Sequence, residues 1–154
     1  MKGFLLLVAL LAVPSLAFAK PKGCMTKAEQ TVEWQIRHGI RLREFAFRCD
    51  EPPYNAGTLA IWRRIDATQT GQFQKMTDSR AKTFEREFPQ TFKSYIEAWN
   101  GRIIMRYRDY YLSDIDCIQT KRQLQDIEKK GFKAFTTLSA RYKPEILMDY
   151  RTCQ

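Results

Sequence analysis

Apolar residues recur along this chain at the three- and four-residue spacing of amphipathic helices, and no alternating strand pattern longer than a few residues occurs. The first helical segment covers about residues 26–48 and starts with a capping box formed by Thr26 and Glu29. Its apolar positions are Val32, Ile36, Ile40 and Phe47, widened by Leu42 and Phe45. This width predicts that more than one side of the helix is covered.

A corner over residues 49–55 separates this helix from the next. Pro52 and Pro53 remove two backbone donors, and the first of them pushes Glu51 out of the α region. The corner therefore ends the first helix, and we expect Asn55 to cap the second.

The second helix is predicted to end near Thr77, with a break or a thin core face near Gly71. Its apolar positions are Leu59, Ile61, Trp62, Ile65, Phe73 and Met76. A separate short helix should carry the pair Phe84 and Phe88, and Pro89 should end or kink it.

The clearest amphipathic pattern starts at Phe92 and predicts a helix that reaches about Tyr111 or Leu112. Its apolar positions are Phe92, Tyr95, Ile96, Trp99, Ile103 and Tyr107.

Ser113 is the next helix start, because Asp114 and Asp116 follow it in the first turn, where the helix dipole favours acidic groups. This last long helix should extend to about Lys143, carried by Ile118, Leu124, Ile127, Phe135 and Leu138. A short C-terminal helix over residues 146–150 is expected after it. The fold class is therefore all-α: a bundle of about four main helices plus a short C-terminal helix, in one domain over residues 20–154.

Residues 1–19 have the pattern of a signal peptide: Lys2, an apolar run over residues 4–12, and the A-x-A motif that ends at Ala19. The apolar run is too short for a membrane anchor. We therefore expect cleavage near Ala19/Lys20 and a periplasmic or secreted protein that does not span a membrane.

The chain has a net charge of +9, which becomes about +8 after loss of Lys2 with the signal peptide. Such a surface attracts acidic proteins or anionic envelope components. The charges are scattered along the sequence, however, and this is also typical of an ordinary solvated surface.

The four cysteines are spaced 25, 68 and 36 residues apart. An even count in an exported chain predicts two disulfides, whereas a zinc site would need close ligand pairs and histidines. A Cys24–Cys49 bridge is excluded, because a helix about 35 Å long separates residues that must approach to within about 7 Å. We favour Cys49–Cys117 with Cys24–Cys153, and the alternative, Cys24–Cys117 with Cys49–Cys153, stays open.

The order of Cys49, Tyr54, Asn55 and Cys117 resembles a group of small, exported, largely uncharacterised helical proteins of proteobacteria. In that group a cysteine ends the first helix, Tyr-Asn follows shortly, and a second cysteine opens the last helix. The resemblance covers roughly residues 30–135, and the outer pair, Cys24 and Cys153, departs from it. It implies a helical architecture and no particular activity.

No catalytic residue can be assigned from the sequence. His38 is the only histidine, so a hydrolase with a histidine base would have to use it, and no serine lies in a G-x-S-x-G motif. Candidate carboxylates for glycoside hydrolysis are Glu33, Glu44, Glu97 and Asp109. Their spacing selects no pair, and ion pairs on the helix surface, Glu33/Arg37 and Glu44/Arg48, are the simpler interpretation.

The acidic residues Asp109, Asp114 and Asp116 lack the order and the distal Glu of a calcium loop, so helix capping explains them better. No cofactor or metal is expected.

Aromatic and basic residues gather near the end of the helix predicted to start at Phe92, and Tyr with Arg is favoured at binding surfaces. The candidate binding residues are Arg102, Arg106, Tyr107, Arg108, Tyr110 and Tyr111. Packing beneath the C-terminal segment would also account for the aromatic ones.

These features favour a non-enzymatic binding or interaction protein of the cell envelope or extracellular space. Its partner would be a protein or an anionic envelope component, without specific nucleic-acid recognition. The alternatives are a small exported hydrolase of cell-wall polysaccharide and an envelope stress chaperone opened by acid or reduction.

Overall fold

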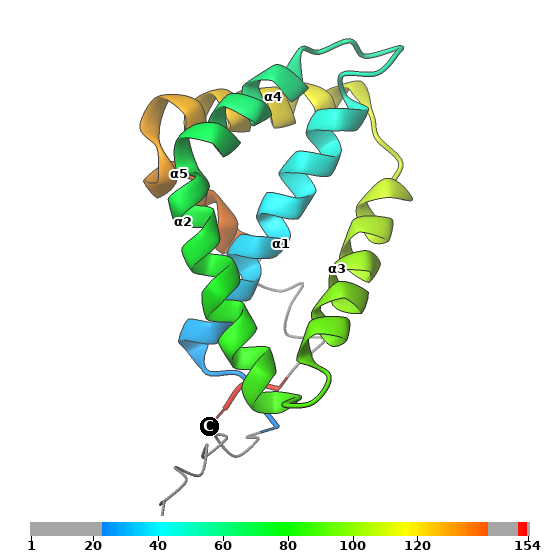
Figure 1. The fold of residues 1–154 in the computed structure, drawn as a ribbon. Helices are drawn as coiled ribbons and strands as arrows, with labels where there is room; N and C mark the ends of the chain where they lie inside the picture. Colours follow the sequence, from blue (N-terminus) through cyan, green and yellow to red (C-terminus); the bar gives the residue numbers. More distant parts are fainter. Residues whose placement is uncertain (1–22, 142–150, 154) are drawn as a thin grey trace, which may run out of the picture.

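The computed structural model describes residues 23–141 and 151–153, and within them the chain forms helices and no strand. The helices are α1 (Lys27–Arg48), α2 (Thr58–Glu87), α3 (Phe92–Arg108), α4 (Asp114–Lys130) and α5 (Phe132–Ser139). α1, α2 and α3 run lengthwise in alternating directions and pack on one another, with α1 in the middle of the view (Figure 1). α4 crosses their upper end, and α5 turns back against α1. The predicted all-α bundle is confirmed.

Both predicted capping motifs are present. The Thr26 side chain accepts a hydrogen bond from the Glu29 amide, and the Glu29 carboxylate accepts one from the Thr26 amide at 2.8 Å. Ser113 and Asp116 make the same reciprocal pair at the start of α4. These interactions satisfy amide groups that a helix start leaves without intrahelical partners, so each fixes where its helix begins.

α1 contributes to two apolar cores, as the width of its stripe predicted. The first core joins α1 to α2, α4 and α5 and contains Ile36, Leu42, Ile65, Leu124 and Phe135. The second joins α1 to the end of α2 and to α3 and contains Phe45, Cys49, Phe84, Trp99 and Tyr107. The burial of Phe47 and Ile118 was wrongly predicted: both side chains are about half exposed, because apolar spacing alone does not show which side of a helix is covered.

The predicted start of the second helix was wrong. Asn55 has a φ of 45°, and Gly57, with a φ of 67°, is the residue that precedes α2. The Thr58 hydroxyl donates to the Ala46 carbonyl at 2.8 Å and ties this start to α1. A tertiary contact therefore sets the helix start in place of the local asparagine cap.

The predicted end of the second helix near Thr77 was also wrong, since α2 continues without interruption to Glu87. The hydroxyls of Thr70 and Thr77 donate to carbonyls one turn earlier, at 2.6 and 2.8 Å, which keeps them compatible with the helix. Phe84 thus lies on α2 and not on a separate helix.

Two further helix ends differ from the predictions. α3 ends at Arg108, before the expected Tyr111 or Leu112. α4 ends at Lys130, because Gly131 adopts a φ of 73°, and the remaining residues form the separate helix α5. The predicted signal peptide (1–19) and C-terminal helix (146–150) lie outside the described residues.

The favoured cysteine pairing is confirmed. Cys49 bonds Cys117 with a Cα–Cα distance of 5.3 Å, and Cys24 bonds Cys153 with a distance of 5.1 Å. Next to the second bridge, Met25 and Thr152 form an isolated parallel β-bridge, which brings the two ends of the described chain together.

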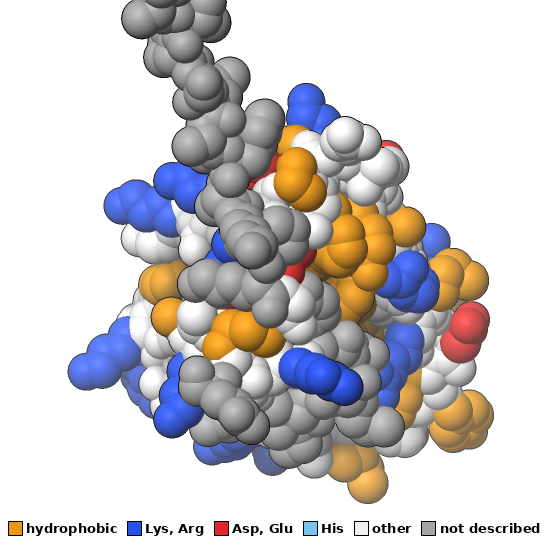
Figure 2. All heavy atoms as spheres, turned by 90° about the horizontal axis from the view of Figure 1, so that it is seen from below, with side chains coloured by type: hydrophobic (Ala, Val, Ile, Leu, Met, Phe, Trp, Pro, Cys, Tyr) orange, Lys and Arg blue, Asp and Glu red, His pale blue; other side chains and the backbone are white. Residues whose placement is uncertain are grey.

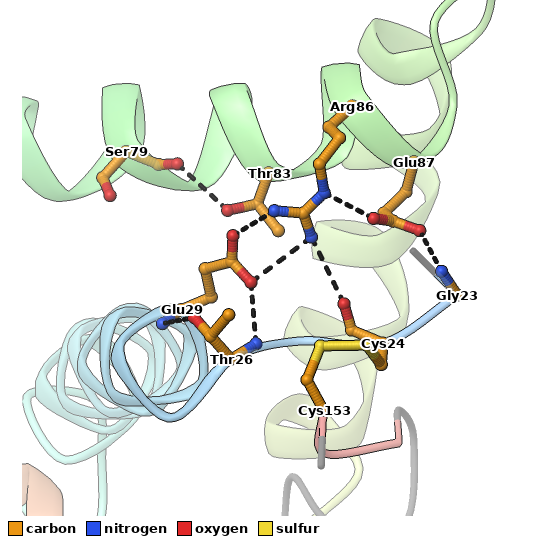
Figure 3. Close-up of polar contacts among 9 residues, drawn as sticks. All are labelled: Gly23, Cys24, Thr26, Glu29, Ser79, Thr83, Arg86, Glu87 and Cys153. Carbon is orange, nitrogen blue, oxygen red and sulfur yellow. Dashed lines mark hydrogen bonds and ion pairs between the residues drawn. A yellow bond between two sulfur atoms is a disulfide. The ribbon is translucent and has the colours of Figure 1, made fainter. Parts of the chain in front are cut away.

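Arg86 on α2 holds the segment that carries the Cys24–Cys153 bridge (Figure 3). Its guanidinium pairs with Glu29 and Glu87 and donates to the Cys24 carbonyl at 3.2 Å, while the Gly23 amide donates to Glu87 at 2.8 Å. Partial burial alone would raise the pKa of Glu29, but the hydrogen bonds from Arg86 and Thr26 and the charge of Arg86 lower it overall. This cluster connects α2 to the start of α1 and to the segment that precedes it.

A basic hollow between α1 and α3

The structure separates the candidate binding residues into three groups. Arg102, Arg106 and Tyr107 line one hollow, together with Arg37, Trp99 and Ile103. Arg108 lies in a second hollow beside Glu44. Tyr110 and Tyr111 lie in the segment that connects α3 to α4.

Trp99 lines the first hollow, which we call the arginine hollow. The guanidinium carbons of Arg37 and Arg102 each lie 5.3 Å from the centre of its ring system. Guanidinium groups at this distance are attracted by the electron-rich ring. The indole therefore positions one buried and one exposed arginine in the same hollow.

A buried carboxylate, Glu33, holds the indole and Arg37 in place. Its Oε1 atom accepts hydrogen bonds from Arg37 Nε at 2.9 Å and from Trp99 Nε1 at 2.7 Å. Its Oε2 atom lies 3.7 Å from Arg80 Nη1. The predicted Glu33/Arg37 pair is confirmed, but it lies in the interior and not on the helix surface.

Buried charged side chains of both signs lie next to the arginine hollow. Glu33 faces two buried guanidinium groups, those of Arg37 and Arg80. Burial lowers the pKa of Arg80, an effect that the charge of Glu33 opposes and the charge of Arg37 increases. The Arg80 Nε and Nη1 atoms have no hydrogen-bond partner among the described residues.

Arg102 and Arg106 add two exposed guanidinium groups at the mouth of the hollow. Neither forms an ion pair with a carboxylate of the described residues. They lie one helical turn apart on α3 and so face the same side. Figure 2 shows Lys and Arg side chains around the lower end of the molecule as well, so basic charge alone does not distinguish α3. Arg102 and Arg106 differ in lining a hollow with Trp99.

Arg108 belongs to a different environment. It donates to Glu44 at 2.9 Å, and Glu44 also binds Arg43 at 2.8 Å. The predicted Glu44/Arg48 pair was wrong, because Arg48 reaches the Tyr107 carbonyl at 2.7 Å. The charge of Arg108 is therefore offset by a carboxylate, in contrast to Arg102 and Arg106.

The three candidate tyrosines differ in exposure. Tyr107 is buried and packs edge-to-face against Phe45, with 6.0 Å between ring centroids. Tyr110 is about half exposed and also contacts Phe45. Tyr111 has 88% of its surface exposed. Tyr107 thus supports the hollow from the core, and Tyr111 contributes only to the outer surface.

His38 lies in the core of the bundle. Its ring stacks on Phe135, and its Nδ1 atom lies 2.9 Å from the Ser139 hydroxyl, which itself donates to the Phe135 carbonyl. Burial lowers the pKa of His38 to about 3, aided by the charge of Arg41 and opposed by a hydrogen bond with Gln123. This geometry is that of a structural histidine without contact to solvent.

The candidate carboxylates serve structural roles or lie on the surface. Glu33 and Glu44 are bound by arginines, whereas Glu97 and Asp109 are exposed on or next to α3. Asp116 completes the capping motif of α4, as predicted. Within residues 23–141 and 151–153 no group of three or more His, Cys, Asp or Glu is placed to hold a metal ion.

Sequence analysis missed the interior half of the arginine hollow. Arg37 was assigned to a surface ion pair, and Arg80 was not considered at all. The spacing of Glu33 and Arg37 indicated a pair but gave no sign of its burial. Nothing in the sequence pointed to Arg80, whose contact with Glu33 joins two different helices.

Comparisons with protein-family models, curated proteins and solved structures give no match for this chain. The resemblance based on Cys49, Tyr54, Asn55 and Cys117 therefore stays a prediction. None of the described helices is long and apolar enough to cross a membrane.

Proposed function

We propose that this protein is an exported, non-enzymatic binding protein of the cell envelope or extracellular space. It recognises an anionic partner, either a protein or another anionic envelope component, through the basic and aromatic face of α3. The observation that carries this proposal is the arginine hollow, in which Arg102 and Arg106 lie beside Trp99 without a carboxylate partner among the described residues.

Two observations support export. Residues 1–19 have the pattern of a cleavable signal peptide. Both cysteine pairs form disulfides, which persist mainly in oxidising compartments such as the periplasm and the extracellular space. An envelope or extracellular partner is the consistent choice.

The chemistry of the hollow favours an anion. Guanidinium groups bind carboxylates and phosphates through paired, charge-assisted hydrogen bonds. Arginine and tryptophan are also enriched among residues that dominate binding energy at interfaces. A negatively charged partner could form charge-assisted hydrogen bonds with the arginines and contacts with Trp99 at one place on α3.

The test compares capture of partners by mature, oxidised protein and by an Arg102→Glu/Arg106→Glu variant. Both are immobilised and exposed to envelope and culture-supernatant extracts at low and moderate salt. The matched control, Arg122→Glu/Lys129→Glu, reverses two exposed charges on α4 and so changes the net charge equally.

We expect a partner that is retained by the wild type and the control and is lost from the α3 variant. Higher salt should weaken the capture, because exposed charges are screened. Equal loss from both variants would show that net charge alone matters. Retention by the α3 variant, or no retained partner at either salt, would refute the proposal.

A further inference from the structure

One end of the molecule carries the exposed apolar side chains. Among the described residues, six large hydrophobic side chains are about half exposed or more, and all of them lie in residues 47–54 or 105–118. They are Phe47, Met105, Tyr110, Tyr111, Ile115 and Ile118. Exposed apolar side chains that gather in this way mark an interaction site, whereas single scattered ones are ordinary.

The two segments that carry these side chains meet in space. Cys49 bonds Cys117 with a Cα–Cα distance of 5.3 Å, and the Tyr54 hydroxyl donates to the Leu112 carbonyl at 2.6 Å. Together the segments form the end of the bundle that α4 crosses, opposite the two ends of the described chain (Figure 1). The exposed apolar side chains therefore lie at one end of the molecule.

The composition of this end suits contact with a second copy of the chain. Residues 43–54 and 105–118 carry four basic and six acidic side chains, although the whole chain has a net charge of +9. Two copies that approach through the rest of their surfaces bring positive charges together, and this end avoids that repulsion. All four basic residues are arginines, and protein interfaces are enriched in arginine and aromatic residues and depleted of lysine.

The second hollow supplies one half of a complementary contact. Its volume is about 530 Å³, and it is lined by one aromatic ring, three arginines and two glutamates: Arg43, Glu44, Phe47, Arg48, Glu51 and Arg108. Arg43 and Arg108 both pair with the Glu44 carboxylate, at 2.8 and 2.9 Å. Because two guanidinium groups share one carboxylate, each keeps N–H groups that can bind a further acceptor.

The segment from α3 to the first turn of α4 supplies the other half. Tyr111 has 88% of its surface exposed, and Ile115 has 66%. Asp109 and Asp114 are exposed and form no ion pair with the Lys and Arg side chains of the described residues. Free carboxylates and an exposed aromatic ring complement the guanidinium groups and the Phe47 ring of the second hollow.

We propose that this protein forms a two-fold symmetric dimer, in which residues 109–115 of each copy dock into the second hollow of the other. A two-fold contact requires both complementary parts on the same surface of one chain. They are adjacent here, since Arg108 lines the hollow and Asp109 begins the docking segment. The inference is independent of the proposed function, because neither part contains Arg102 or Arg106.

The first test is sedimentation equilibrium of the mature, oxidised protein over a range of concentrations. We expect the mass to rise from that of one chain to that of two chains and no further, because a two-fold contact is closed. Tyr111→Ser/Ile115→Ser should weaken dimerisation by about tenfold or more, since each lost apolar contact counts twice in a symmetric dimer. Thermal unfolding of each variant verifies that it is folded.

A charge-swap experiment tests whether the two parts meet. Asp109→Arg/Asp114→Arg places basic groups against the basic hollow, and Arg43→Glu places an acidic group against the aspartates, so each variant alone should dimerise about tenfold more weakly or worse. An equal mixture of the two should form a mixed dimer, because opposite charges then face each other at both contacts. Asp66→Arg/Asp78→Arg on α2 changes the net charge as much as the first variant and should largely keep the dimer.

Three results would overturn the inference. The wild type could sediment as a single chain at every concentration, its mass could rise beyond two chains, or the charge-swap mixture could form no more dimer than either variant alone. A single-chain wild type that instead captures another envelope protein through Tyr111 and Ile115 would assign this end to a different partner and would equally refute the dimer.

Discussion

We expect the buried side chain of His38 to make the stability of this protein sensitive to acid. The ring stacks on Phe135 and bonds with Ser139 in the first apolar core, so a protonated imidazole would be held away from water. In the unfolded chain the same group titrates near its ordinary pKa of 6.5. The folded state therefore disfavours a proton that the unfolded state accepts.

We predict that the free energy of unfolding falls as the pH is lowered from about 6.5 towards 3. In this window the pKa of His38 in the folded protein, about 3, lies below its unfolded value, so the unfolded state binds more protons. One such group changes the free energy by up to about 1.4 kcal/mol per pH unit. Urea unfolding between about pH 7 and pH 5 measures the slope, above the range in which Glu29 titrates.

His38→Asn is the control for this slope. The asparagine amide keeps a donor near Ser139 but does not titrate, so stability should be lower than that of the wild type near pH 7 and nearly flat between about pH 7 and pH 5. An equal slope in the variant and the wild type would mean that other groups cause the acid sensitivity. The acid-opened chaperone alternative would then lose its one candidate trigger in the sequence.

Among the helices, α2 is the one that local sequence preferences least support. Gly71 and a run of threonines and glutamines lie in its middle, yet the helix extends over 30 residues. Contacts of its two halves with α1, α3 and α4 maintain it. Tertiary packing commonly outweighs weak helix propensity in this way.

Gly71→Ala should therefore stabilise the protein by about 0.5–1 kcal/mol, because alanine loses less backbone entropy in a helix. A Cβ atom at Gly71 meets no heavy atom within 4 Å, so no steric cost opposes this gain. Urea unfolding at neutral pH measures the change.

Gly131→Ala, in contrast, should lower the free energy of unfolding in the same urea measurement. This glycine has a φ of 73° at the junction of α4 and α5, a conformation that side chains with a Cβ rarely adopt. Destabilisation by Gly71→Ala would indicate that the middle of α2 is not helical.

In the molecule as a whole, the two disulfides differ in their access to solvent. Cys49 and Cys117 are both buried in the second apolar core, whereas Cys24 and Cys153 are partly exposed. The first bridge ties α1 to α4, and the second ties the ends of the described chain together beside Arg86.

We predict that dithiothreitol reduces Cys24–Cys153 before Cys49–Cys117 in the folded protein, because the reductant must reach a sulfur atom. Alkylation with iodoacetamide followed by peptide mass spectrometry identifies the reduced pair. In denaturant the two pairs should react at similar rates. Earlier labelling of Cys49 and Cys117 under native conditions would contradict the prediction.

Removal of the outer bridge by Cys24→Ser/Cys153→Ser should lower the free energy of unfolding by about 2–5 kcal/mol, since the bridge closes a long loop. Urea unfolding measures the loss. The helical circular dichroism signal of the folded variant should be retained, because both apolar cores and Cys49–Cys117 remain. A molten or unfolded variant would show that the bridge is needed for the fold itself.

Features that depend on neighbouring residues could be predicted well from the sequence. The Thr26 and Ser113 caps and the main apolar patterns of α1 to α4 use residues within about one helical turn of each other. The length of a rigid helix also excluded a Cys24–Cys49 bridge, whereas the choice between the other two pairings depended on how the helices pack.

Features that depend on contacts between helices could not be predicted. Glu44 binds Arg108 from α3 in place of Arg48 one turn away, and Thr58 bonds to Ala46 across the corner. Phe47 fits the apolar spacing of α1, yet its side chain is about half exposed. Periodicity identifies a helix but does not say which of its sides has a partner.

The candidate site shows the same division. Sequence analysis identified the basic and aromatic residues of α3, because they cluster within a few turns. Which of these arginines pairs with a described carboxylate depends on the position of α1: Arg108 binds Glu44, whereas Arg102 and Arg106 line the hollow with Arg37. Residues close in sequence thus determined which segments form helices, how these helices are capped and which charged residues they carry. The packing of α1 against α2 and α3 determined the buried charges and the hollow, because these require side chains that are distant in sequence to meet.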